Sequence, residues 1–300
     1  MKKLLAITAL VAGNVFCAFA NITEGELQQL ITENGGQLDL SNRKLLVEYI
    51  RLITSTLSKI KSLDLSGNDI DDEGARYIAE ALNANTTLTS LNLAQNNIGD
   101  VGVKYLSEAL KTNTTLTSLD LRFNRIFDEG PRFLSDALKV NITLTSLYLC
   151  FDSLDAKGAK SIAEALETNS TLTSLDLHFN FMGDKGVEYL SKALNLNTTL
   201  TTLDLAENYI GSAGTASLAE ALKTNSTLTK LNLSCNCLDD EGVNSLAKAL
   251  ETNSTLTELC LEDQQVSSEE ETSEEEDIFE EMEGLSNTEN WNSAQTGRIN

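Results

Sequence analysis

One short pattern recurs every 28 residues through most of this chain, and this period constrains the fold more than any other feature of the sequence. The pair Leu63-x-Leu65 is the first of eight copies in strict phase. The later pairs begin at Leu91, Leu119, Leu147, Leu175, Leu203, Leu231 and Leu259. A polar residue, usually Asn, follows the first Leu of each pair by five positions. A period of about 20–50 residues indicates stacked repeats rather than one closed globular domain.

The spacing within one repeat predicts a short strand followed by a helix. A period of two places Leu63 and Leu65 on one face of the strand and Asp64 on the other. A helical stripe with spacing i, i+3, i+4 and i+7 comes next, formed in the first copy by Ala75, Ile78, Ala79 and Leu82. Each repeat therefore has one apolar strand face and one apolar helix face, which must be buried together.

Small and polar residues occupy the positions that join strand to helix. An Asn amide both donates and accepts hydrogen bonds, so a stack of Asn68 equivalents can satisfy loop backbone groups. Gly74 and its counterparts lie where a side chain would keep the helix away from its strand. The Asn of each N-x-[ST] sequence, first Asn85, is open to two interpretations, a glycosylation site or a loop residue, and the loop geometry favours the second. The predicted helix N-caps are Asp72, Asp100, Asp128, Asp184, Ser212 and Asp240.

These positions match the pattern L-x-x-L-x-L-x-x-N-x-L, so residues 60–266 resemble the leucine-rich repeat. The repeat length is similar to that of ribonuclease inhibitor, NOD-like receptors and the Ran GTPase-activating protein. The resemblance implies an α/β solenoid, a horseshoe with a parallel β-sheet on its concave face and helices on its convex face. Stacked copies share one core, and each fully buried Leu contributes about 1.5–3 kcal/mol. Residues 21–59 are expected to form an N-terminal cap or degenerate first repeat, and a truncated eighth copy ends the stack.

The two ends of the chain differ from the repeats. Lys2 and Lys3 precede an apolar run that closes with Ala18-Phe19-Ala20, which indicates a signal peptide, residues 1–20. We therefore expect a secreted, periplasmic or cell-surface protein without a membrane span after cleavage; an uncleaved anchor and a cytoplasmic location are the alternatives. Residues 262–300 hold 13 acidic residues against one base, which predicts an acidic disordered tail over residues 267–300.

Composition and motifs argue against several classes of function. A formal net charge of −23 does not suit nucleic acid as the main ligand, because phosphate binding needs clustered Lys and Arg. The sequence shows no nucleophile–base set and no phosphate-binding loop, so we expect no enzyme activity and no cofactor. A single His and scattered cysteines predict no metal centre.

Functional information should lie where the repeats differ from one another, because packing dictates the positions that they share. Large and aromatic residues gather in the third to sixth copies. Such residues within polar surroundings are typical of a protein-binding hot spot. A second interpretation, that the three Phe at positions 123, 151 and 179 are extra core, remains open. The candidate partner-binding residues are Arg122, Phe123, Arg125, Tyr148, Phe151, Asp152, His178, Phe179, Phe181 and Tyr209.

Acidic and amide residues between the paired leucines would give the concave face a negative field. This field suits a basic protein partner, although a solvated face kept soluble by its charge explains the same residues. We expect an exported protein-interaction module, an effector or adhesin, that binds a partner protein through its concave face. The alternatives are an enzyme regulator similar to ribonuclease inhibitor or the Ran GTPase-activating protein, and a purely structural surface protein.

Overall fold

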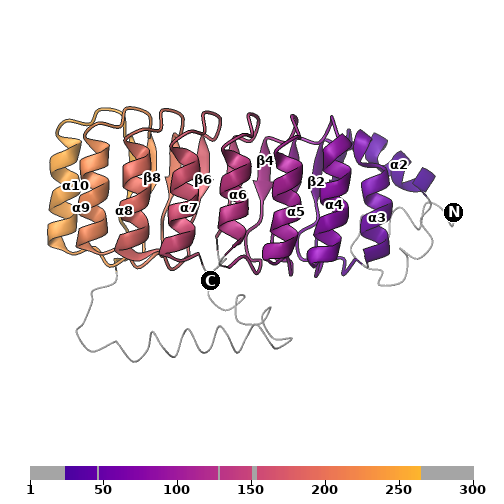
Figure 1. Cartoon of the computed structure of the whole chain (residues 1–300), viewed down its shortest axis with the longest axis horizontal. Helices are drawn as coiled ribbons and strands as arrows, with labels where there is room; N and C mark the ends of the chain where they lie inside the picture. Colours follow the sequence, from indigo (N-terminus) through magenta and orange to yellow (C-terminus); the bar gives the residue numbers. More distant parts are fainter. Residues whose placement is uncertain (1–23, 46, 128, 151–153, 265–300) are drawn as a thin grey trace, which may run out of the picture. The chain divides into compact units, whose positions relative to one another are not determined.

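The computed structural model describes residues 24–45, 47–127, 129–150 and 154–264. Within these residues, nine short strands form one parallel sheet in which each strand pairs with its neighbours in the sequence (Figure 1). The predicted signal peptide and acidic tail lie outside the described residues. The strands are β1 (Gln37–Asp39), β2 (Ser62–Asp64), β3 (Ser90–Asn92), β4 (Ser118–Asp120), β5 (Ser146–Tyr148), β6 (Ser174–Asp176), β7 (Thr202–Asp204), β8 (Lys230–Asn232) and β9 (Glu258–Cys260).

A helix follows each of the strands β1 to β8, and the helices cover one face of the sheet (Figure 1). A helix also precedes β1, and a single 3₁₀ turn, η2 (Leu57–Lys59), leads into β2. Each helix of the repeats packs beside the helices of the adjacent repeats. The helices are α2 (Glu24–Glu33), α3 (Val47–Ser55), α4 (Asp72–Ala84), α5 (Asp100–Leu110), α6 (Gly130–Leu138), α7 (Ala156–Leu166), α8 (Gly183–Leu194), α9 (Ser212–Leu222) and α10 (Asp240–Leu250).

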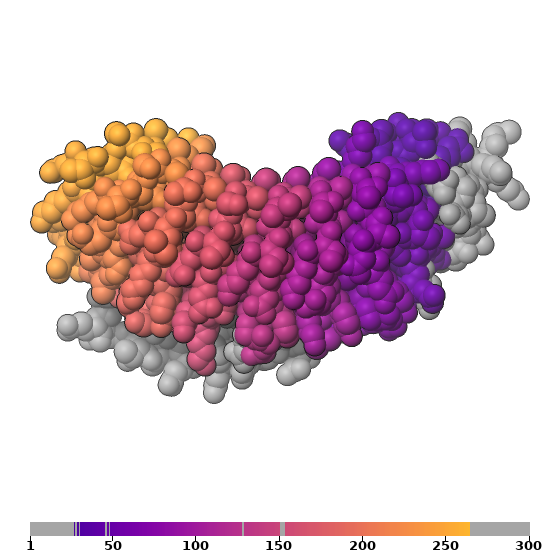
Figure 2. Space-filling view, turned by 45° about the horizontal axis from the view of Figure 1, so that its top comes forward, coloured from indigo at the N-terminus to yellow at the C-terminus, as the bar shows by residue number. Residues whose placement is uncertain are grey.

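The core lies between the sheet and the helices and is built from stacked leucines. Leu63 pairs in register with Leu38 and Leu91, and the same register continues along the sheet. Both leucines of the strand motif are buried in all repeats but the last, where Leu259 and Leu261 are half-buried. The predicted alternation is confirmed, and the chain forms the α/β horseshoe. Strands are about 4.8 Å apart whereas packed helices need about 8–10 Å, so the repeats bend around the sheet (Figure 2).

A ladder of asparagines runs beside the strands and confirms the role predicted for it. The Nδ2 group of Asn96 donates to the carbonyls of Leu65 and Leu93, 3.1 and 2.9 Å away. Its Oδ1 accepts from the backbone N–H groups of Asn68 and Ile70 in the preceding repeat, at 3.0 and 2.9 Å. Each amide therefore joins two repeats through backbone groups that the stack removes from water.

A second asparagine ladder follows the helices. The Nδ2 group of Asn113 donates to the carbonyl of Leu82 in the preceding repeat, and its Oδ1 accepts from the N–H groups of Thr115 and Leu116. Asn85 and its equivalents up to Asn225 are buried in the same way. This arrangement supports the loop interpretation of the N-x-[ST] sequences, because these amide nitrogens point into the protein.

The prediction of the helix N-caps was wrong by one residue for α4, α5, α9 and α10, and by two residues for α8, whose N-cap is Met182. Asp71 and Asp239 are the caps of α4 and α10, and their side chains accept from N–H groups in the first turns of those two helices. Helices α5 and α9 instead begin after Gly99 and Gly211, and Gly cannot cap with a side chain. Asp128 lies outside the described residues.

Asp72, Asp100 and Asp184, which were predicted as caps, act instead on the next repeat. Asp72 Oδ1 accepts from the N–H groups of Gly99 and Gly102 at the start of α5, both at 2.8 Å. Asp184 makes the same two contacts at the start of α9, at 2.7 and 2.9 Å. A Cβ atom on Gly102 would lie 2.7 Å from Asp72 Oδ1, so the glycine lets this carboxylate approach. An Asp of one repeat thus caps the helix of the next repeat, and the pattern within a single repeat does not reveal this.

Candidate functional site

A charged and aromatic cluster occupies the solvent face of the sheet at β4 and β5. Tyr148 lies in register between Asp120 and Asp176 of the neighbouring strands. Arg122 binds Asp120 through Nε, at 2.9 and 3.0 Å, and through Nη2, at 2.6 Å. Its guanidinium also lies 5.3 Å from the centre of the Tyr148 ring. The hydrogen bonds to Asp120 raise the pKa of Arg122 and hold its guanidinium over the tyrosine.

The next repeat carries a His–Asp pair at the equivalent positions. His178 Nδ1 lies 2.7 Å from Asp176 Oδ1. Burial lowers the pKa of His178, but the hydrogen bond that its imidazole donates to Asp176 and the charges of Asp176, Asp204 and Glu207 outweigh it, so the pKa is raised. The carboxylate thus orients the imidazole on the strand face and stabilises its protonated form.

Two aromatic rings stack at the loop edge of the sheet. The rings of Phe181 and Tyr209 are 5.7 Å apart and inclined by 12°. Tyr209 is 38 % exposed, so the pair presents an apolar surface to solvent. Arg125 occupies the same position in an earlier repeat, and its side chain is also exposed.

Phe123 and Phe179 lie in the loops that follow β4 and β6, and both side chains are half-buried. Neither belongs to the buried core of the described residues, so they are not simply additional core side chains. Their φ angles are +56° and +52°, but Gln95 and Glu207 adopt the same conformation at the equivalent position of other repeats. The left-handed backbone is therefore a property of the repeat and not of the candidate site. Phe151 and Asp152 lie outside the described residues.

The acidic groups between the paired leucines are less available for contacts with a partner than the sequence suggests. Asp120 and Asp176 bind Arg122 and His178, as described above. Asp64 and Asp204 accept hydrogen bonds from the equivalent asparagines of the next repeat, at 2.9 and 3.1 Å. The contribution of Asp120 and Asp176 was missed, although they precede Arg122 and His178 by two positions, a spacing that places both side chains of each pair on one face of a strand.

A groove of about 330 Å³ adjoins the charged cluster on the strand face. Polar side chains of β2, β3 and β4 line its floor, among them Asp64 and Asn92. Arg122 and Tyr148 close one end of it. This groove could receive a polar or basic segment of another protein while the aromatic residues make apolar contacts beside it.

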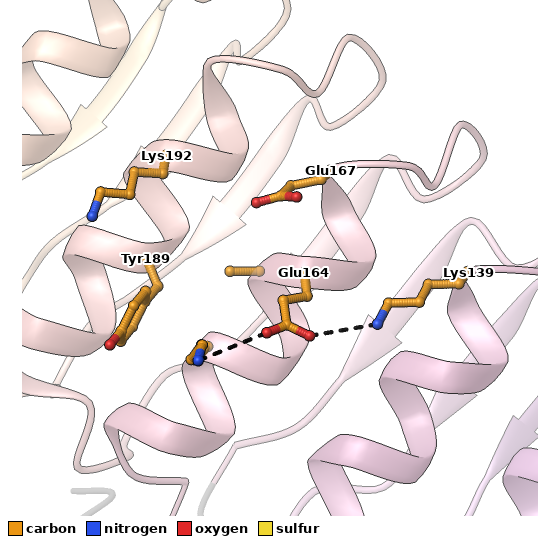
Figure 3. A pocket seen from close by; sticks show the side chains of 7 residues that line it. Lys139, Glu164, Glu167, Tyr189 and Lys192 are labelled. Atoms are coloured by element: carbon orange, nitrogen blue, oxygen red, sulfur yellow. Dashed lines mark ion pairs between the residues drawn. The ribbon is translucent and has the colours of Figure 1, made fainter.

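The helix face has a different kind of hollow, between α6, α7 and α8 (Figure 3). Glu164 lies there between the ammonium groups of Lys139 and Lys160, at 3.5 and 4.0 Å. These side chains are about half exposed, and ion pairs of this kind contribute little to stability or binding. The strand face is therefore the better candidate site.

None of the helices in the described residues is long and apolar enough to cross a membrane.

Comparisons with known proteins agree with this architecture. A leucine-rich repeat family model matches residues 56–79, 84–107, 112–134, 168–191, 196–219 and 224–247. The leucine-rich repeat protein LegL7 from Legionella pneumophila has a similar structure, with 20 % identity and a TM-score of 0.50, over 88 % of this chain and 87 % of that one. At this identity the likeness concerns the fold alone.

Two actin-related structures match a smaller part of the chain. Actin-binding site 2 of leiomodin-1 has 25 % identity and a TM-score of 0.42, over 49 % of this chain and 92 % of that one. The tropomodulin C-terminal domain from Caenorhabditis elegans has 19 % identity and a TM-score of 0.38, over 43 % and 78 %. No curated protein matches the sequence. With its in-phase leucine and asparagine ladders and nine-stranded parallel sheet in the described residues, the chain is a leucine-rich repeat protein of the 28-residue type.

Proposed function

We propose that this protein is an exported binding module that holds a partner protein against its strand face. The observation that carries the proposal is the arrangement of Asp120, Arg122 and Tyr148 beside the groove. An Arg that is already oriented by a carboxylate loses little side-chain freedom when a partner binds, so more of its contact energy appears as affinity.

The aromatic residues beside the groove supply the apolar part of this surface. Tyr148 is half-buried under Arg122, and the stacked pair of Phe181 and Tyr209 lies at the edge of the same face. Tyr and Arg are the residue types on which interface affinity most often depends. The polar lining of the groove and the net charge of −23 favour a partner segment that carries Lys or Arg.

The binding proposal is tested by replacing Tyr148 with Ala. Partners are first captured with the wild-type chain from extracts and culture fluid, identified by mass spectrometry, and then titrated in purified form. Tyr148→Ala should weaken binding at least about fivefold, the equivalent of about 1 kcal/mol. Tyr105→Ala is the matched control, because Tyr105 is 39 % exposed on α5, away from the strand face. Equal losses in both variants, or an unchanged affinity in Tyr148→Ala, would remove the strand face from the proposal.

Export is proposed from the pattern of residues 1–20 and is tested separately. Expression with a C-terminal tag, followed by fractionation and N-terminal sequencing, should yield an exported chain that begins at Asn21. Recovery of the tagged chain in the cytoplasmic fraction with its leader intact contradicts export and leaves the binding proposal standing.

A further inference from the structure

The strand face brings together three side chains of the types that bind transition metals. The ligand atoms of Cys150, Asp176 and His178 all lie within 4.8 Å of one another. Cys150 and His178 occupy the same position in adjacent repeats, 28 residues apart. Asp176 precedes His178 by two residues and lies on the same face of the sheet. The in-register pairing of Tyr148 with Asp176 therefore places the three groups beside one another.

The geometry points to a binding site for Zn²⁺ or a similar divalent transition ion at these residues. Thiolate, imidazole and carboxylate are the three protein ligand types of zinc sites. Zinc–ligand bonds of about 2.0–2.3 Å place neighbouring ligand atoms roughly 3.3–3.8 Å apart. The Cys150 sulfur therefore has to move closer by up to about 1 Å, whereas His178 Nδ1 and Asp176 Oδ1, which are 2.7 Å apart, have to separate slightly. Water or a group from a bound partner would complete a tetrahedral shell.

The surroundings suit a cation that enters from the solvent side. Cys150 is fully buried and forms the floor of the site, whereas the side chains of Asp176 and His178 are 15 % and 26 % exposed. Asp204 and Glu207 add negative charge near the imidazole. The positive charge of Arg122, which is also close to Cys150, is compensated by its two-oxygen contact with Asp120.

Binding changes the protonation of the site in a defined way. The Cys150 thiol releases its proton to solvent and donates a sulfur electron pair to the metal. The coordinating nitrogen of His178 must likewise be unprotonated. The hydrogen bond between Asp176 and His178 orients the imidazole before the metal binds, and the carboxylate then becomes a ligand or supports the ring from outside.

The experiment uses Co²⁺ as an optical probe for the full chain under reducing conditions. One equivalent of Co²⁺ should produce a thiolate-to-cobalt charge-transfer band, and added Zn²⁺ should abolish it. Cys150→Ala should lose this band. Cys235→Ala is the matched control, because it removes a half-buried thiol about three repeats further along and should leave the band unchanged. His178→Gln should bind Co²⁺ at least about tenfold more weakly than the wild type.

Two results would overturn the site. One is the absence of a thiolate band with the wild-type chain, and the other is a band that survives Cys150→Ala. Circular dichroism checks that each variant is folded. If Cys150→Ala is unfolded, His178→Gln decides the question, because its side chain is partly exposed and its removal leaves the core intact. Unchanged Co²⁺ affinity in folded His178→Gln then refutes the site.

Discussion

At the scale of single residues, the polar side chains of this protein chiefly connect neighbouring repeats. Asn96 bonds backbone groups on both sides of a repeat boundary, and Asn113 does so at the helix ends. No apolar residue could replace these amides, because each one both donates and accepts. The asparagines therefore maintain the register of the stack as well as satisfying buried groups.

Replacing Asn96 with Ala should lower the free energy of unfolding by at least about 2 kcal/mol. The substitution leaves the N–H groups of Asn68 and Ile70 without their acceptor, and each unsatisfied buried group costs about 1–3 kcal/mol. The Leu65 carbonyl keeps its second donor, the Nδ2 group of Asn68. Urea denaturation, monitored by circular dichroism, measures this loss of stability. Asn83→Ala, at an exposed position on α4, is the control and should stay within about 0.5 kcal/mol of the wild type.

At the scale of elements, the helices differ in where their N-terminal caps come from. Helices α4, α7 and α10 are capped by their own Asp. Helices α5 and α9 receive an Asp carboxylate from the preceding repeat. Adjacent helices are consequently coupled by polar contacts as well as by apolar packing.

Asp72→Ala and Asp71→Ala should therefore affect different helices. Loss of Asp72 should destabilise the protein by about 1–2 kcal/mol and increase hydrogen exchange at the start of α5, because two N–H groups lose their acceptor there. Loss of Asp71 should increase exchange at the start of α4, the helix that it caps. Hydrogen-exchange mass spectrometry distinguishes the two regions. Faster exchange confined to α4 in both variants would contradict capping between repeats.

The cap of α10 should make stability depend on pH in the acid range. Hydrogen bonds from the Ser212 side chain and the Gly242 N–H lower the pKa of Asp239 below its ordinary value of 3.8. A lowered pKa stabilises the folded state above the unfolded-state value, and this contribution is lost as the pH falls through the folded-state value. The melting temperature of the wild type should thus exceed that of Asp239→Asn at about pH 6 and converge with it toward about pH 2. A constant difference across this range would show that the charge of Asp239 has no such effect.

At the scale of the whole molecule, stability should be a sum of repeats and of the interfaces between them. The last repeat is the least covered, because Leu256, Leu259 and Leu261 are only half-buried where no further described repeat packs on them. The described repeats share one register and one core, so the stack can change its length by a whole period without changing its local structure.

Deletion of residues 200–227 should leave a folded protein, because the cut removes one full 28-residue period and rejoins equivalent positions. Helicity per residue should stay unchanged by circular dichroism. The free energy of unfolding and its denaturant dependence should both fall, since one interface and its buried area are lost. A deletion variant without cooperative unfolding would show that the repeats are not interchangeable.

Local periodicity was enough to predict the strands, the helices and the buried faces. Leu63, Leu65 and Asn68 recur at positions that only one packing arrangement can bury and satisfy, so the repeat alone determines the sheet and its core. Much of the candidate site was also predictable, since Arg122, Tyr148 and His178 stand out as departures from the repeat.

Contacts between repeats were decided by the tertiary structure. The sequence does not show that Asp72 caps the following helix, because Asp71 and Asp72 are equally good caps when one repeat is considered alone. Nor does it show that Cys150 meets Asp176 and His178, because that meeting depends on how the side chains of two neighbouring strands are oriented toward one another. Periodicity describes each repeat by itself, whereas the partners of its exposed side chains depend on how the next repeat is placed against it.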